Sequence, residues 1–321
     1  PGPACYGRGD KPTVTDANVV LGRLNPQALL GGTFPIDAAR SHAAVASVSA
    51  PLGGDVERTA AGIVALADAE MAKVLRIVSV ERGLDPRDFT LMAFGGGGPL
   101  HACALGADLG MWRVIVPSRP GLFSAIGLLA ADVRVSLSRS LVAPLDADTF
   151  ARARAVAAEL GAAASAELRE HGTDLGGLRT IVEADLRYTG QSFDLTIPFT
   201  GDATSLADAF HARHQRRYGY AVPEERVEIA TVRVTAVAMP GSGPAERAAA
   251  NADLSAARIG TRRAWDNGAF AGAALYERER LPANATFDGP AIVEQYDTTT
   301  WIPNGWRASA SGGGDLVLER Q

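Results

Sequence analysis

The chain has 321 residues, 47% of them hydrophobic and 21% charged, which are the proportions of an ordinary folded protein. Its formal net charge is −5 and it contains no basic stripe, so nucleic acid is not an expected partner. Two cysteines without metal-ligand spacing are typical of a reducing, cytoplasmic compartment. Neither a signal peptide nor an apolar run of membrane-spanning length is present, so no membrane contact is expected.

The first residues, Pro1–Gly7, lack a starting Met and have the glycine and proline content of a loop. We therefore expect the chain to be a C-terminal piece of a longer polypeptide, or one half of a split one. A helix is predicted to begin at Thr15, a residue type that caps helices, and to continue to residue 24. Asp16 then lies in the first turn. It either compensates the helix dipole or directs a polar group at a ligand or metal.

Two further helices are predicted, over residues 38–48 and 56–82, and the longer one has apolar residues at a helical period throughout. Arg76 and Ser79 lie three residues apart near its end and share a face. That face is either solvated or directed into a cleft beside the glycine-rich segment that follows. Only a short link, residues 85–88, joins the two.

The organising stretch of the chain is residues 90–101, which we interpret as a buried strand over 91–94, four glycines and a helix start. The glycines allow positive φ angles and let a ligand approach the main chain. Free amides and a helix dipole at such a loop favour an anion or a sugar, so a nucleotide-type ligand is expected. The alternative is a tight connection that only lets strand and helix pack closely. The glycines of this candidate site are Gly95, Gly96, Gly97 and Gly98.

The order of expected elements gives three regions. Strands and helices alternate up to residue 140, which indicates an α/β layer with a mainly parallel sheet. Residues 141–245 read as an α+β unit, and residues 246–321 as a small β-rich domain of short strands. On a helix over 205–218, His211 and His214 have a spacing that metal ligands can use, but no acidic residue completes the set, so we expect a solvated polar face there.

Several phrases together resemble the hydantoinase A/oxoprolinase family, in that family's order and over nearly the whole chain. The phrases are residues 2–9, 13–18, 78–83, 93–101, 185–192 and 289–295. The resemblance implies the second half of an actin-like (ASKHA) ATPase core over 1–140. The α+β and small all-β C-terminal domains follow it.

In this resemblance Gly95–Gly98 match an adenosine-binding motif, with Gly97 where relatives often have Ala. Arg76, Ser79 and His101 are further nucleotide-binding candidates, and Asp16 is the catalytic candidate. ATP and Mg²⁺ are the implied cofactors, whereas the metal ligands are not identified. The family's Asp-Gly-Gly-Thr type phosphate motif does not occur in this sequence, so the N-terminal half that carries it is an expected partner.

The implied activity is ATP-dependent opening of a cyclic amide, a hydantoin or 5-oxoproline, through phosphorylation of the amide oxygen, with a hydantoinase B-type subunit completing hydrolysis. A first alternative is the ATP-binding β subunit of an acetone or acetophenone carboxylase. A second alternative is a non-catalytic scaffold half that binds a B-type partner.

Overall fold

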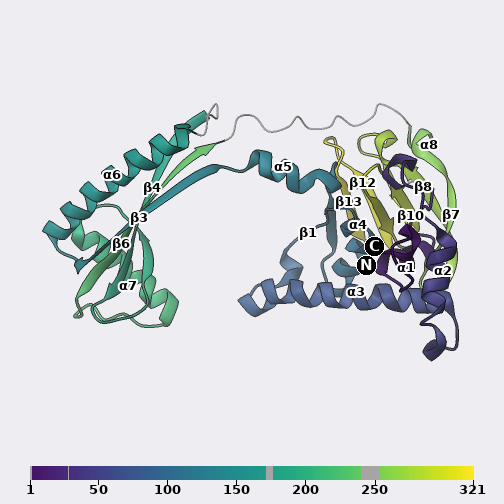
Figure 1. Cartoon of the computed structure of the whole chain (residues 1–321), viewed down its shortest axis with the longest axis horizontal. Coiled ribbons are helices and arrows are strands. Elements are labelled where there is room, and N and C mark those ends of the chain that lie inside the picture. The colour runs from purple at the N-terminus through teal and green to yellow at the C-terminus, as the bar shows by residue number, and fades with distance from the viewer. Residues whose placement is uncertain (1, 28, 171–175, 240–252) are drawn as a thin grey trace. The chain divides into compact units, whose positions relative to one another are not determined.

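The computed structural model describes residues 2–27, 29–170, 176–239 and 253–321 and contains two compact units (Figure 1). The first unit combines Pro1–Ala125 with Ala245–Gln321, and the second is Ile126–Pro244. The chain is thus divided differently from the three regions expected from sequence, because the C-terminal region folds together with the N-terminal one. Within the described ranges, no helix combines the length and apolar character that crossing a membrane requires.

The C-terminal strands do not form a separate domain. They complete a five-stranded sheet with the order β1-β2-β13-β12-β9. Its strands are β1 (Leu91–Met92), β2 (Arg113–Val116), β13 (Leu316–Arg320), β12 (Trp306–Ala310) and β9 (Thr286–Asp288). Only β1 and β2 are parallel, so the expected mainly parallel sheet is not formed. Leu316 and Leu318 lie opposite Val116 and Val114, and all four side chains are buried in one core, which explains why the tail joins this sheet.

A second sheet in the same unit has the order β11-β10-β8-β7. Its strands are β11 (Thr299–Ile302), β10 (Ala291–Glu294), β8 (Ala269–Glu277) and β7 (Arg258–Asp266). Ala291, Val293 and Ile302 share a core with the first sheet and with Ala102 and Cys103 of α4 (Gly98–Asp108). The opposite set, which includes Ile292 and Trp301, packs against Cys5, Val19 and Leu24 near the N-terminus. The N-terminal segment therefore packs against this second sheet, whose strand β11 lies beside α4.

The helices of this unit begin and end at recognisable signals. They are α1 (Val14–Val20), α2 (Ala38–Ala46), α3 (Val56–Val78) and the short α8 (Leu254–Ala257), and α5 (Phe123–Ala130) contains the boundary to the second unit. Thr13, rather than the expected Thr15, is the N-cap of α1, because the Asp16 side chain reaches back to the Thr13 amide in a capping box.

The strand before the glycines is less buried than its apolar sequence suggests. β1 lies at the edge of the five-stranded sheet and pairs only with β2. Met92 is 46% exposed and Phe94 is 45% exposed. The expectation of a strand covered on both faces is therefore wrong for the described chain, since an edge position leaves alternate side chains uncovered.

The second unit is a four-stranded antiparallel sheet with the order β3-β6-β4-β5 and two helices on one face. Its elements are β3 (Val133–Pro144), α6 (Ala147–Glu170), β4 (Gly176–Tyr188), β5 (Leu195–Pro198), α7 (Ala203–Tyr218) and β6 (Val227–Met239). The expected solvated histidine face is wrong for His214, which is buried and lies 2.8 Å from the Tyr220 carbonyl through Nδ1. His211 Nδ1 lies 2.9 Å from the Tyr188 hydroxyl. Both rings therefore hold the end of α7 in place.

Candidate functional site: a cavity at the glycine loop

The glycine loop presents free backbone donors at the start of α4. Gly95 has φ +82°, a conformation that favours glycine, and its amide donates to the Pro120 carbonyl at 2.8 Å. Gly97 is the N-cap of α4. The amides of Gly96, Gly97 and Gly98 have no hydrogen-bond partner among the described residues. Unpaired amides at the positive end of a helix dipole are a ready site for an anion.

A cavity of about 440 Å³ opens beside this loop, and segments distant in sequence line it. Its volume lies within the roughly 300–1,000 Å³ of small-molecule sites. A Cβ built on Gly97 meets no atom within 4 Å, and one built on Gly96 meets only the Asp297 carbonyl at 3.6 Å. The bend is thus open rather than filled by neighbouring side chains. The lining includes Tyr6, Arg8, Thr15, Leu24, Asn25, Phe34, Gly96, Gly97, Leu100 and residues 294–299.

The turn between β10 and β11 is joined to the glycine loop by side-chain hydrogen bonds. Thr298 Oγ1 donates to the Gly96 carbonyl at 2.9 Å, and Gln295 Nε2 donates to the Ser118 carbonyl at 2.8 Å. The first bond holds the turn against the glycine loop and the second holds it against the segment after β2, and neither bond uses the free amides. The β10–β11 turn, which lines one side of the cavity, is therefore fixed to the glycine loop, which lines another side.

Asp297, in the same turn, is a candidate functional residue that the sequence reasoning missed. It lines the cavity, and its Oδ1 atom is buried without a hydrogen-bond partner in the described part of the chain. Its carboxylate occupies space that only a glycine at position 121 leaves open, since a Cβ there would lie 2.5 Å from Asp297 Oδ2. A buried, unpaired carboxylate oxygen is costly, which points to a ligand or cation. A sequence signal existed: an acidic residue two positions after the 289–295 motif, between two strands.

Asp16, the catalytic candidate, is fully buried and does not line the cavity. Its carboxylate accepts five hydrogen bonds, from the Ala4, Cys5 and Thr13 amides and the Thr13 and Ser41 hydroxyls, at 2.7–3.1 Å. Burial alone raises the pKa of this carboxyl, but the donors outweigh burial and lower the pKa to about 2. The bonds tie the N-terminal loop to α1, and this loop brings Tyr6 and Arg8 to the cavity.

His101, Arg76 and Ser79 mark where α3 lies along α4. His101 Nδ1 is 2.6 Å from Asp68 Oδ1 of α3, near the start of α4. Arg76 binds Asp108 Oδ2 at 2.8 Å, at the other end of α4 and about 15 Å along the helix from Gly98. Ser79 Oγ donates to the Leu75 carbonyl. The two helices run in the same direction, so the end of α3 lies away from the glycine loop, and the structure does not bring Arg76 and Ser79 together with it.

The cysteines offer no activated nucleophile. Burial raises the pKa of the Cys5 thiol to about 11, and burial also raises the pKa of the Cys103 thiol. Neither cysteine lines the cavity, whose charged lining residues are Arg8, Glu294 and Asp297.

Comparison with known proteins assigns the family. The hydantoinase/oxoprolinase family matches residues 1–136, and the hydantoinase/oxoprolinase C-terminal domain matches residues 146–311. The chain belongs to the hydantoinase/oxoprolinase family. The N-terminal loop and the glycine loop of this family member fall in the first matched region, and the β10–β11 turn falls in the second.

Family members with named activities match nearly the whole chain. The caprolactamase subunit alpha of Pseudomonas jessenii is 33% identical and is matched over 96% of this chain and 46% of its own length. A nucleotide-free acetone carboxylase structure has a TM-score of 0.86 at 28% identity, over 99% of this chain and 48% of its own. The ATP-dependent caprolactamase structure from P. jessenii has a TM-score of 0.76 at 30% identity, over 100% and 48%. The chain thus spans about half the length of the relatives it matches.

Proposed function

We propose that the cavity at the glycine loop is the nucleotide-binding part of an ATP-dependent enzyme that opens cyclic amides of the hydantoin or 5-oxoproline kind. One observation carries the proposal: the N-terminal loop, the glycine loop and the β10–β11 turn, all parts of or next to the family motifs, line one cavity at the unpaired amides of α4. Solved relatives described as ATP-dependent support a nucleotide as the ligand.

The chemical need for ATP follows from the amide. An unstrained amide carbonyl is a poor electrophile, and transfer of the ATP γ-phosphoryl group to the amide oxygen would make its carbon a far better one, with ADP leaving. Addition of water would give a tetrahedral intermediate that expels the ring nitrogen as an amine, which breaks the C–N bond. Hydrolysis of the acyl phosphate that results would release the carboxylate and phosphate. Such a transfer depends on positioning and charge neutralisation rather than on a covalent residue.

The chain's own residues would act on the nucleotide in distinct ways. The amides of Gly96 and Gly97, which line the cavity, would bind anionic oxygens, and Arg8 would add a positive charge there. No group of three His, Cys, Asp or Glu in the described residues forms a metal cage. Mg²⁺ commonly binds one or two carboxylates together with phosphate oxygens and water, so Asp297 fits as a single protein ligand.

We propose an actin-like arrangement, in which a nucleotide lies between two lobes and this chain supplies one of the lobes. Leu66, Val74, Ile77 and Val78 of α3, with Met92 of β1, are exposed apolar side chains. A face of this kind is typical of a surface that another domain covers. We infer that the other half of the enzyme, and a B-type subunit, complete the site in the cytoplasm.

One alternative has specific support. The TM-score of 0.86 to acetone carboxylase favours an ATP-binding carboxylase subunit, in which the activated carbonyl is a ketone. The other alternative, a non-catalytic scaffold half that binds a B-type partner, has no such observation in its favour. ATP turnover stimulated by hydantoins or 5-oxoproline separates the amidase from the carboxylase, which ketones would stimulate.

The test is ATP binding by calorimetry, on the chain alone and with the other half of the protein, using Gly97→Val. Residue 97 has φ −111° and its Cβ meets no atom, so valine fits the backbone but projects beside the free amides. We expect at least tenfold weaker ATP binding with unchanged thermal stability. Gly312→Val is the matched control, since Gly312 is exposed and its Cβ also meets no atom. Equal ATP affinity in wild type and Gly97→Val would contradict the nucleotide assignment.

A further inference from the structure

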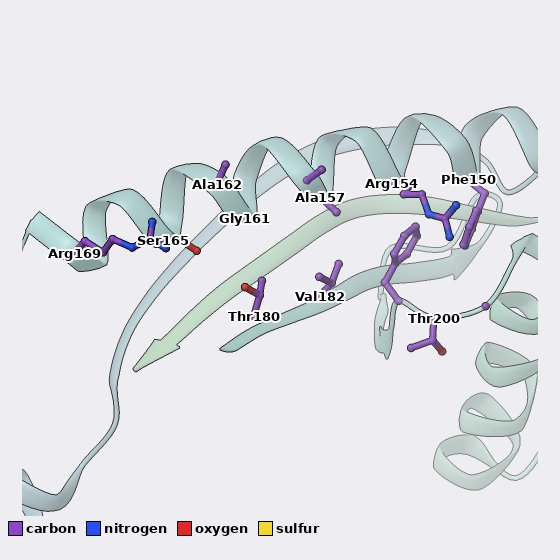
Figure 2. Close-up of a pocket in the computed structure, with 13 residues that line it drawn as sticks. Phe150, Arg154, Ala157, Gly161, Ala162, Ser165, Arg169, Thr180, Val182 and Thr200 are labelled. Atoms are coloured by element: carbon purple, nitrogen blue, oxygen red, sulfur yellow. The ribbon is translucent and has the colours of Figure 1, made fainter. Parts of the chain in front are cut away.

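The second unit contains a groove that the proposed nucleotide chemistry does not use. It has a volume of about 650 Å³ and lies between α6 and the side of β4 (Figure 2). Small residues of α6 form its roof: Ala157, Ala158, Gly161, Ala162 and Ser165. Thr180 and Val182 of β4, with residues 199–201 after β5, form the opposite wall. The groove exists because α6 packs mainly over β3 and β6, which leaves Thr180 of β4 exposed and Val182 only half-buried.

The edge of β4 is open along this groove. β5 pairs only with residues 183–186 of β4, and the Phe199 amide makes the last contact, to the Val182 carbonyl at 2.9 Å. Residues two apart in a strand direct their backbone groups to the same side, so Thr180 directs its amide and carbonyl to the open edge. No strand among the described residues pairs with β4 there. An unpaired edge of this kind accepts an added strand.

A polar side chain inside the groove also lacks a partner. Ser165 is 9% exposed, and its hydroxyl has no hydrogen-bond partner in the part of the chain that the structure describes. In Figure 2 its oxygen lies on the side of α6 that faces the strands. Because this hydroxyl lines the groove and makes no hydrogen bond to the described chain, it is free to pair with a carbonyl or amide of a bound ligand.

The two ends of the groove are positively charged. Arg154 lies at one end, beside Phe150, and Arg169 lies at the other (Figure 2). The two positions are fifteen residues apart on α6, which is about 22 Å along the helix axis at about 1.5 Å per residue. An extended segment of about six or seven residues has this length, at about 3.3 Å per residue. Acidic residues at both ends of such a segment would meet the guanidinium groups.

We propose that this groove binds an extended protein segment that adds as a strand to the open edge of β4, with acidic residues about six positions apart that pair with Arg154 and Arg169. The edge supplies backbone hydrogen bonds, Ser165 supplies one more polar contact, and the small roof residues admit alternate side chains. This binding site is independent of the nucleotide cavity and does not depend on the proposed function.

The experiment pans a displayed library of random decapeptides on the whole chain. We expect recovered peptides to be rich in β-branched residues between two acidic positions. Bound as synthetic peptides, they should protect the Thr180 amide from hydrogen exchange. Peptides that still bind after N-methylation of their central residues would overturn the strand-addition mode. Equal protection by glutarate, a free dicarboxylate, would overturn the proposal in favour of a small-anion site.

Matched variants separate groove binding from general effects. Ala162 and Ala163 are both exposed on α6, but only Ala162 lines the groove. Ala162→Trp should weaken peptide binding at least tenfold, whereas Ala163→Trp should not. Arg154→Glu should weaken binding of acidic-ended peptides, whereas Arg152→Glu, on the same helix outside the groove, should leave it unchanged. If no recovered peptide distinguishes wild type from Ala162→Trp, the groove is not the docking site.

Discussion

Two regions that border the glycine-loop cavity each contain a carboxylate with a buried oxygen, and the two carboxylates differ in how their hydrogen-bond acceptor capacity is used. In the N-terminal loop with α1, Asp16 accepts five hydrogen bonds and is fully buried. In the β10–β11 turn, Asp297 has a buried oxygen that no described group contacts. A saturated carboxylate holds structure, because it has no acceptor capacity left for a ligand. A carboxylate with unused acceptor capacity beside a cavity can accept from a ligand or bind a cation. We therefore propose Asp297, rather than Asp16, as the functional carboxylate.

The largest expected effect is the loss of stability on Asp16→Asn. The amide nitrogen would face donors instead of accepting from them, so we expect a loss of about 3 kcal/mol in the free energy of unfolding. Urea denaturation measures it, and Asp10→Asn in the exposed part of the same loop is the control. A normal unfolding free energy combined with at least tenfold lower turnover would instead support the catalytic role that the sequence favoured for Asp16.

Acid should remove the contribution of Asp16 to stability. Because its folded pKa of about 2 lies below the ordinary value of 3.8, the carboxylate stabilises the fold above about pH 4. This contribution, about 2 kcal/mol, is lost as the pH falls toward 2. We expect the difference in unfolding free energy between wild type and Asp16→Asn to shrink over this range. The Arg87 side chain also lowers the pKa of Asp85, but Asp85 is present in both proteins, so its pH dependence cancels in the difference between their unfolding free energies. A difference that is constant with pH would contradict the saturated carboxylate.

Which features the sequence could predict depends on how far apart along the chain the interacting residues lie. The glycine loop and the start of α4 were predictable, because positive φ, missing side chains and Pro99 are local properties. The pairing of β13 with β2 was not, since it joins segments about 200 residues apart. The position of Arg76 depends on the direction of α3 along α4, which no local pattern contains. The Oδ1 atom of Asp297 becomes buried without a hydrogen-bond partner only when the β10–β11 turn packs against Gly121.

Asp297→Asn should weaken Mg²⁺–ATP binding about tenfold, equivalent to about 1.4 kcal/mol, because the change removes a carboxylate that can reach a cation. Stability should stay unchanged or rise slightly, since the Oδ1 atom that is buried without a partner belongs to a carboxylate in wild type and to a neutral amide in the variant. Calorimetry with and without Mg²⁺ checks the effect, and Asp288→Asn, at an exposed position of β9, is the control. A variant whose ATP affinity depends on Mg²⁺ as strongly as that of wild type would remove Asp297 from the metal site.

The smallest effect is expected for Arg76→Ala. Its ion pair with Asp108 is half-exposed, so its loss should change the unfolding free energy by at most about 0.5 kcal/mol. ATP affinity should not change, because Arg76 lies at the far end of α4 from the glycine loop. Arg8→Ala is the informative partner variant, since Arg8 lines the cavity and its loss should weaken ATP binding several-fold. If Arg76→Ala weakened ATP binding more than Arg8→Ala, the end of α3 would have to reach the nucleotide. The cavity at the glycine loop would then not be the main nucleotide-binding site.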